Sequence, residues 1–317
     1  MSLSIREQIE AARASKPVFI VGVPRSGTTL LYRTLLRHSS FRPEAANPVS
    51  TLVETKVFQD FSERNPALLL YMYNDDEAYS HYLSATKWLR ARNRLMEKTT
   101  GVYSRKCFGS AGRSRLWRML GHDRLIALYF YHAQAARRCT RMVEKTPQHQ
   151  AHIPEIMATF PGAAFIWIHR HPLDVFSSYR RRGDSEERDA LRPQAAARWM
   201  QVSPEQFCRR YQFAVANCRR AMSDPTIPMY RVGYESFVAE PGDTFKTVCN
   251  FLGEPFEPDC VTAAHSDIQD PRDPLLSSGI QAKTKDWEKF VKEEEAALIE
   301  STLCEDMAHL GYESYTE

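Results

Sequence analysis

The stretch PVFIVGVPRSGTT, residues 17–29, decides the fold. Residues 18–23 are apolar without polar alternation, a pattern typical of a strand buried on both faces of a parallel sheet. The stretch GVPRSGTT, from Gly22 to Thr29, has the glycine spacing of a phosphate-binding loop, and the leucines that follow recur at helical spacing. Strand, glycine loop and helix in this order predict the first half of a nucleotide-binding βαβ unit.

One residue separates this loop from those of nucleoside triphosphatases. Thr28 stands where those loops have a lysine that reaches the outer phosphates. The backbone N–H groups of a glycine loop at a helix N-terminus bind an anion without any side chain, and Arg25 adds a cation with several donors. The loop therefore predicts an anion site and disfavours a triphosphate with magnesium. A plain strand-to-helix turn is the alternative.

The composition is that of an ordinary globular protein. Of 317 residues, 43% are hydrophobic and 26% charged, with a net charge of +3. This excess is too small to indicate a nucleic-acid partner. No run reaches the roughly 18 apolar residues of a membrane span, and the N-terminus is polar. Seven scattered cysteines predict reduced thiols and no metal site. We expect a soluble, cytoplasmic protein and leave its oligomeric state open.

Two further stretches have strand character, residues 163–168 (AAFIWI) and residues 227–234 (IPMYRVGY). Pro172 suits the first turn of a helix after the former, and a helical pattern after the latter ends at Gly253. The order predicts an α/β, three-layer P-loop-type fold with a central, mostly parallel sheet. No repeat or linker divides the chain, so we expect residues 1–317 to form one domain. Residues from about 55 to 138 are expected to form a large helical insertion covering the acceptor site.

The loop PRSGTT after a buried strand resembles the 5'-phosphosulfate loop of sulfotransferases that use 3'-phosphoadenosine 5'-phosphosulfate (PAPS). Four further stretches follow in the family's order, so the resemblance runs from about Lys16 to Trp287. Within the family, the chain most resembles bacterial members related to the tyrosylprotein sulfotransferases. The resemblance implies PAPS as the sulfate donor, no metal, and a donor-binding loop made of Arg25, Ser26, Gly27, Thr28 and Thr29.

Two of these stretches imply residues that hold the donor's charged groups. EKTPQH, residues 144–149, resembles a Lys-Ser/Thr-Pro segment, which implies that Lys145 stabilises the leaving phosphate. In RHPLDVFSSY, residues 170–179, Arg170 and Ser178 resemble the family's 3'-phosphate site. Their spacing alone does not show that they meet, although arginine and a serine hydroxyl suit a phosphate monoester.

The other two stretches imply contacts around the nucleotide. RVGYESFVAEPGDTFKTVCNFLG, residues 231–253, resembles a Tyr-Glu-x-Leu segment with its downstream helix. This implies that Tyr234 contacts the adenine or the 3'-phosphate, with a core tyrosine as the alternative. SSGIQAKTKDW, residues 277–287, resembles the C-terminal loop that closes over the donor, which implies a contact from Lys283 or Lys285.

The general base has several candidates. STLVETKVFQDF, residues 50–61, resembles the segment that carries a glutamate base in the tyrosylprotein group and many bacterial members, which nominates Glu54. Glu44 competes within the preceding loop. Some relatives use histidine instead, and His149 lies close to Lys145 in the sequence.

The resemblance implies in-line transfer of a sulfuryl group from PAPS to an acceptor hydroxyl, with release of adenosine 3',5'-bisphosphate. The acceptor is expected to be a small molecule, lipid, glycan or carrier-bound hydroxyl compound, and a tyrosine-bearing peptide remains open. Two alternatives are a small-molecule kinase that uses ATP and magnesium and a non-catalytic nucleotide-binding module. Thr28 and the pair of Arg170 and Ser178 disfavour the kinase.

Overall fold

The computed structural model describes residues 3–42, 58, 122–187, 200–262, 280 and 287–316. Most of the expected helical insertion lies outside these residues. Two parts of it are described, namely Phe58, which is buried, and helix α7 (His122–Arg137). Of the expected site residues, Glu44, Glu54, Lys283 and Lys285 lie outside the described residues.

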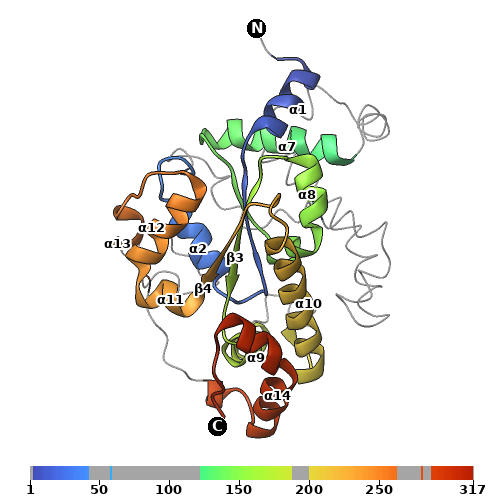
Figure 1. Ribbon diagram of the computed structural model, residues 1–317, viewed down its shortest axis with the longest axis vertical. Helices are drawn as coiled ribbons and strands as arrows, with labels where there is room; N and C mark the ends of the chain where they lie inside the picture. Colours follow the sequence, from blue (N-terminus) through green and yellow to red (C-terminus); the bar gives the residue numbers. More distant parts are fainter. Residues whose placement is uncertain are drawn as a thin grey trace. The chain divides into compact units, whose positions relative to one another are not determined.

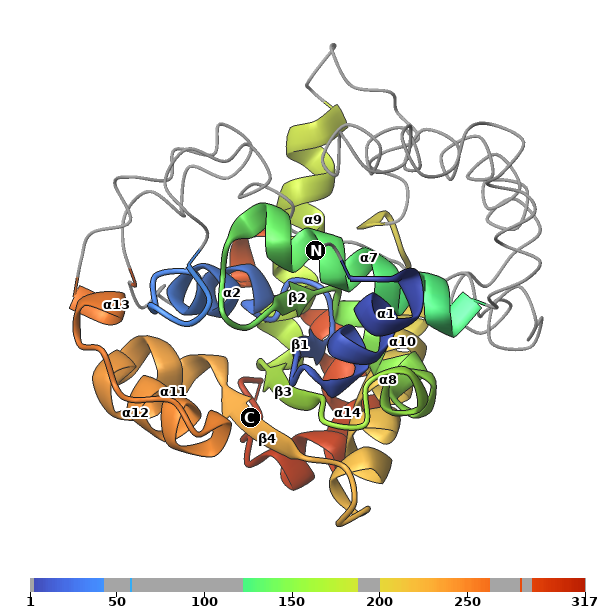
Figure 2. The same cartoon turned by 90° about the horizontal axis from the view of Figure 1, so that it is seen from above.

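Four strands form one sheet (Figure 1), in the order β2-β1-β3-β4, and Figure 2 labels all four of them. They are β1 (Val18–Gly22), β2 (Val143–Lys145), β3 (Ala164–His169) and β4 (Met229–Gly233). The N–H of Val18 donates to the carbonyl of Met142, and the N–H of Ala164 donates to the carbonyl of Pro17. The starts of β1, β2 and β3 therefore lie side by side, so these strands run in the same direction. The predicted α/β fold with a central parallel sheet is confirmed.

Burial explains which strands the sequence reveals. All five residues of β1 and all six of β3 are buried, as expected from their uninterrupted apolar runs. Strand β4 is only partly buried and lies at the edge of the sheet. Strand β2 is a segment of three residues, VEK, and is buried although two of them are charged. Its length and charge explain why no strand was predicted there.

The chain packs as two compact units, and β1 and β3 each run from one unit into the other. The first unit comprises Met1–Phe19 and Tyr32–Phe165, and the second comprises Ile20–Leu31 and Ile166–Glu317. This packing does not test whether residues 1–317 are one domain in the family sense, so that expectation stays a prediction.

The first unit is held by an aromatic core. The Phe19 ring lies 5.7 Å from Phe130 and 5.7 Å from Phe165, and Phe130 lies 4.7 Å from Phe160. Such pairs stabilise by roughly 0.5–1.5 kcal/mol each beyond their area burial. Helix α1 (Ile5–Ala14), which packs on α7 (Figure 2), begins at a capping box made by Ser4 and Glu7. A 3₁₀ helix, η3 (Pro147–His152), leads into α8 (Ile153–Thr159).

The second unit begins with the glycine loop. Its other elements are α9 (Pro172–Glu187), α10 (Pro204–Met222), α11 (Tyr234–Ala239), α12 (Pro241–Leu252), α13 (Asp259–Thr262), η8 (Trp287–Lys289) and α14 (Glu293–Leu310). Helices α9, α10 and α14 pack against one another. Helix α2 (Thr28–Leu35) follows the loop and passes from this unit into the first.

The predicted helix boundaries are largely confirmed. Helix α9 begins at Pro172, and Gly253 ends α12 in the left-handed region with φ 70°. The helix expected between Tyr234 and Gly253 is instead two helices. Glu240 separates them with φ −131° and ψ 67°, because the residue before a proline, here Pro241, is driven out of the helical region.

No helix among the described residues is long and apolar enough to cross a membrane. The described cysteines are free thiols: Cys139, Cys208, Cys218, Cys249, Cys260 and Cys304.

Gly22→Ala should lower the free energy of unfolding by about 2 kcal/mol or more. Gly22 has φ 149°, and a Cβ there would lie 2.3 Å from the carbonyl oxygen of Ile168, which belongs to a buried strand and cannot move aside. Chemical denaturation measures the loss. Gly242→Ala in α12 is the control, because a Cβ there meets nothing within 4 Å. Equal unfolding free energies for the wild type and Gly22→Ala would contradict the close approach of β1 to β3.

Candidate active site

The loop between β1 and α2 has an unusual backbone. Arg25 and Gly27 both have positive φ, 74° and 95°, and a non-glycine residue at such a φ costs of order 1–3 kcal/mol unless its surroundings hold it there. The Nε atom of Arg25 donates a hydrogen bond of 3.1 Å to the Oγ atom of Ser178 in α9, which helps to hold it. Turns with residues in the left-handed region form anion-binding nests, and within this loop the N–H of Ser26 already donates to the carbonyl of Val23.

Gly27 lets the loop lie directly against the residue that follows β4. A Cβ on Gly27 would be 2.4 Å from Cδ2 of Tyr234. The Tyr234 ring also contacts Arg170, whose guanidinium lies 4.3 Å from the ring centroid. The loop, Tyr234 and Arg170 therefore form a continuous series of contacts within the second unit.

The structure brings four of the predicted residues of this unit together as two contacting pairs. Ser178 contacts Arg25, whereas the described contacts of Arg170 are with Tyr234 and Asp174. The resemblance assigns Arg170 and Ser178 to one phosphate, and that assignment stays a prediction. Thr28 is buried at the start of α2, and Thr29 is the next residue of that helix.

Arg170 is a buried cation whose charge is only partly balanced. Its Nη2 atom is 3.9 Å from Oδ2 of Asp174, which is too long for a hydrogen bond. A cation–π contact adds roughly 0.5–2 kcal/mol, while the desolvation of a buried ion costs several kcal/mol. Its Nε atom is buried with no hydrogen-bond partner among the described residues. An anion that accepts from this donor would correct the imbalance.

Ser26 gives a second observation of the same kind. Its side chain is fully buried, and its hydroxyl has no partner within the described ranges. Buried polar atoms almost always have partners, so unpartnered donors on both Ser26 and Arg170 favour an anionic ligand. Burial raises the pKa of Tyr234 and the nearby Arg170 opposes this only in part, so the Tyr234 hydroxyl remains a donor at neutral pH.

The predicted residues of the first unit lie on β2 and η3. Lys145 is the last residue of β2 and is buried. The carboxylate of Glu144 accepts a hydrogen bond of 2.6 Å from Thr146 Oγ1 and lies 2.9 Å from Nδ1 of His149. The Nε2 atom of His149 is buried and has no partner among the residues described.

The surroundings of His149 favour a structural role over that of a base. Its ring is fully buried and stands edge-on to Phe58, 5.4 Å between centroids, and to Phe19, 6.1 Å. Glu144 fixes the ring by its Nδ1 atom, which leaves Nε2 facing an apolar environment. The alternative that His149 is the base stays a prediction.

Sequence reasoning missed Asp174, the acidic partner of Arg170. The sequence carried only a weak signal, because Asp174 lies four residues after Arg170 but Arg170 precedes α9, so the helical pairing rule does not apply to it. Within the described part of the chain, no group of three or more histidine, cysteine or acidic side chains could hold a metal ion.

A model of the sulfotransferase family matches residues 17–258 of the chain. The chain belongs to the sulfotransferase family. As a sulfotransferase it is an enzyme that transfers a sulfuryl group, and the family acts on hydroxyl acceptors. The predicted family and function are thereby confirmed. The closer relation to the tyrosylprotein group stays a prediction.

Solved structures of bacterial sulfotransferases resemble this sulfotransferase. STF9 from Mycobacterium avium matches with 16% identity and a TM-score of 0.54, over 98% of this chain and 81% of that chain, which shows a shared fold. The sulfotransferase domain from the curacin biosynthetic pathway matches with 19% identity and a TM-score of 0.46, over 94% and 98%. The sulfotransferase from Alicyclobacillus acidocaldarius matches with 16% identity and a TM-score of 0.46, over 95% of this chain and 97% of that chain. No curated protein matches the chain.

Gly27→Ala should weaken anion binding at the loop at least tenfold, because the new Cβ displaces either the loop or the Tyr234 ring. The shift of the thermal unfolding midpoint with rising inorganic sulfate measures binding, since a ligand of the folded state stabilises it by mass action. Gly183→Ala in α9 is the matched control, because a Cβ there makes only an ordinary contact of 3.8 Å with Gln201. An unchanged sulfate response in Gly27→Ala would refute this role for the loop.

Proposed function

We propose that the enzyme transfers the sulfuryl group of PAPS to an acceptor hydroxyl by in-line attack and releases adenosine 3',5'-bisphosphate. The observation that carries this is the contact series from Ser178 through Arg25 and Gly27 to Tyr234 and Arg170. Arg25, near one end of the series, is partly buried, and Arg170, at the other end, is buried beside the Tyr234 ring. This arrangement suits a ligand that has an anionic group at each end of a nucleoside.

The donor set fits PAPS. Ser26 and Arg170 each have a buried donor atom without a partner among the described residues. PAPS supplies a phosphosulfate on the 5' side, from which the sulfuryl group leaves, and a phosphate on the 3' side. The loop N–H groups and Arg25 would hold the former, and Arg170, through its planar fork of donors, would hold the latter.

Lys145 would stabilise the charge that develops on the leaving phosphate oxygen. The assignment rests on the resemblance of residues 144–149 to the family's Lys-Ser/Thr-Pro segment, and Lys145 is buried as the last residue of β2. In a parallel α/β sheet, ligands bind at the carboxyl ends of the strands. A preorganised charge of this kind contributes about 10²–10³ in rate when measured by removal of one group.

Glu54 would take the proton of the acceptor hydroxyl. The assignment rests on the resemblance of residues 50–61 to the family's glutamate segment. A positioned base contributes roughly 10²–10⁴ in rate. The acceptor would be a hydroxyl on a small molecule, lipid, glycan or carrier-bound compound. The transferred group bears less charge than a terminal phosphoryl group, so the proposal includes no metal.

Adenosine 3',5'-bisphosphate should bind more tightly than adenosine 5'-monophosphate by tenfold or more, and ATP with magnesium should bind weakly. Calorimetric titration of the three ligands measures this. Arg170→Gln should remove the preference for the bisphosphate, because the donor fork toward the 3'-phosphate is lost. Arg220→Gln on the exposed side of α10 is the matched control. Tight binding of ATP with magnesium, together with no preference for the bisphosphate, would favour a kinase.

Glu54→Gln should abolish turnover and leave the affinity for adenosine 3',5'-bisphosphate unchanged. Turnover is followed by mass spectrometry of a host extract incubated with the enzyme and isotopically labelled PAPS, where the labelled sulfate ester also identifies the acceptor. His149→Asn is the comparison, and it should retain turnover. Wild-type turnover by Glu54→Gln would exclude Glu54 as the base, and loss of turnover in His149→Asn alone, with the wild-type unfolding midpoint and affinity for adenosine 3',5'-bisphosphate retained, would identify His149 instead.

A further inference from the structure

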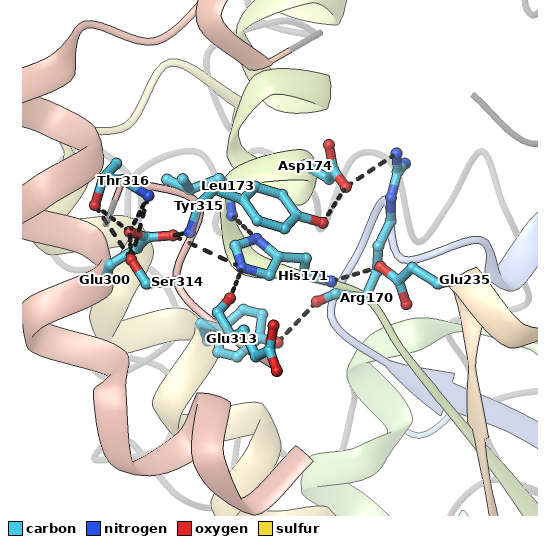
Figure 3. A network of polar contacts seen from close by, with 11 residues as sticks. Arg170, His171, Leu173, Asp174, Glu235, Glu300, Glu313, Ser314, Tyr315 and Thr316 are labelled. Atoms are coloured by element: carbon cyan, nitrogen blue, oxygen red, sulfur yellow. Dashed lines mark hydrogen bonds and ion pairs between the residues drawn. The ribbon is translucent and has the colours of Figure 1, made fainter. Parts of the chain in front are cut away.

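The C-terminal segment, residues 312–316, packs against the turn that carries Arg170 (Figure 3). The segment follows α14, which ends at Gly311 with φ 81°. It lies beyond residues 17–258, the part that matches the family model. No motif recognised in the sequence assigns it a role, yet its side chains reach several residues next to Arg170.

A buried carboxylate anchors the segment. Glu300 in α14 accepts hydrogen bonds from Ser314 Oγ at 2.6 Å, from the N–H of Tyr315 at 2.7 Å, and from the N–H and the hydroxyl of Thr316. Burial opposes ionisation of Glu300, but these hydrogen bonds outweigh it and lower its pKa. Hydrogen bonds to an ionised acceptor are about twice as strong as neutral ones, so the segment is held firmly at this end.

The anchored segment places the rings of Tyr312 and Tyr315 against His171, the residue that follows Arg170. The ring of Tyr315 stacks on His171 with 3.6 Å between centroids and 9° between planes. The Nε2 atom of His171 donates to the carbonyl of Glu313 at 3.1 Å, because its Nδ1 atom accepts from the N–H of Leu173. The Tyr315 hydroxyl also lies 3.5 Å from Oδ2 of Asp174, the partner of Arg170.

Tyr312 acts on the same turn through a carboxylate. Its hydroxyl donates to Oε2 of Glu235 at 2.8 Å, and Oε1 of Glu235 accepts the N–H of His171 at 2.9 Å. The carbonyl on the other side of this peptide group, that of Arg170, accepts from the Tyr211 hydroxyl at 2.8 Å. Both polar atoms of the Arg170–His171 peptide group therefore have partners. Tyr211 holds the carbonyl oxygen, and Glu235, which Tyr312 orients, holds the N–H.

The contact of Tyr312 with His169 completes its orientation. The Nδ1 atom of His169 lies 2.7 Å from the Tyr312 hydroxyl oxygen. Burial, with Arg231 and His309 nearby, lowers the pKa of His169 to about 3, so the ring is neutral. Since the hydroxyl proton is donated to Glu235, His169 carries its proton on Nδ1 and donates to the oxygen. Tyr312 thus has a hydrogen-bond partner on each side and little rotational freedom.

We propose that Tyr312 is a positioning residue for the anion site. Through Glu235 it fixes the peptide group between Arg170 and His171. It thereby sets the affinity for the anionic group that Arg170 binds. This inference rests on the proposed function, in which that group is the 3'-phosphate. A hydroxyl that only stabilised the fold would affect all ligands of the site alike. A positioning residue affects the 3'-phosphate selectively.

Tyr312→Phe tests the proposal, because it removes the hydroxyl and keeps the ring between His169 and His171. The ratio of the dissociation constants of adenosine 5'-monophosphate and adenosine 3',5'-bisphosphate, measured by calorimetry on the full chain, should fall about tenfold, as expected for a hydrogen bond to a charged group. The control is Tyr230→Phe, since the described contact of Tyr230 is the stacking of its ring on Phe251. Tyr230→Phe should keep the wild-type ratio.

Glu235→Gln shows whether Tyr312 works through Glu235. In the double variant Tyr312→Phe/Glu235→Gln the ratio of dissociation constants should fall by no more than in Glu235→Gln alone, because the effects of two coupled residues are not additive. An unchanged ratio in Tyr312→Phe, or fully additive losses, would overturn the proposal.

Two further outcomes are distinct from these. If the wild type itself has no preference for the bisphosphate, the proposed function fails before the role of Tyr312 is reached. If Tyr312→Phe does not fold, Ser314→Ala decides, since it removes a hydrogen bond to the anchor Glu300 and leaves Tyr312 intact. It should lower the ratio by a smaller factor, about threefold, and an unchanged ratio would overturn the proposal.

Discussion

The close approach of β1 to β3 at Gly22 is the constraint on which the site depends. A Cβ at this position would lie 2.3 Å from the Ile168 carbonyl oxygen, so only glycine allows the chain to leave the sheet there. The loop that follows lies against Tyr234 through a second glycine, Gly27, and Tyr234 supports Arg170. The loop and the Arg170 side chain thus both lie against the buried Tyr234 ring, which holds them in place before a ligand binds, as preorganised electrostatic binding requires.

The charges of the site follow from this geometry. Arg25 belongs to the loop and Arg170 follows β3, and each has a polar or acidic neighbour, Ser178 or Asp174. Asp174 is too far from Arg170 for a hydrogen bond, so it offsets part of the charge while the Nε atom of Arg170 has no hydrogen-bond partner among the described residues. A tighter ion pair would be more stable by itself but would compete with an anionic ligand for the same donors.

The sequence predicts those parts of the site that are formed by residues close together in the chain. The glycine loop, the start of α9 at Pro172 and the end of α12 at Gly253 each depend on a local backbone preference, and all three are found where expected. Strand β2 was not predicted, because three residues with two charges have no periodicity. The pairing of Ser178 with Arg25 was also missed, since it joins residues 153 positions apart.

By itself, the sequence determined the fold class and the family, because buried strands, glycine turns and helix starts leave patterns within a few residues of one another. Only the tertiary structure decided which side chains meet. It brings Arg170 onto Tyr234, and it brings the C-terminal segment onto the peptide group after Arg170. Tyr312 and Glu235 are 77 positions apart, and no local propensity records a hydrogen bond at that separation. Such contacts arise from the packing of α14 against α9 and α10, which depends on the complementarity of complete helix surfaces.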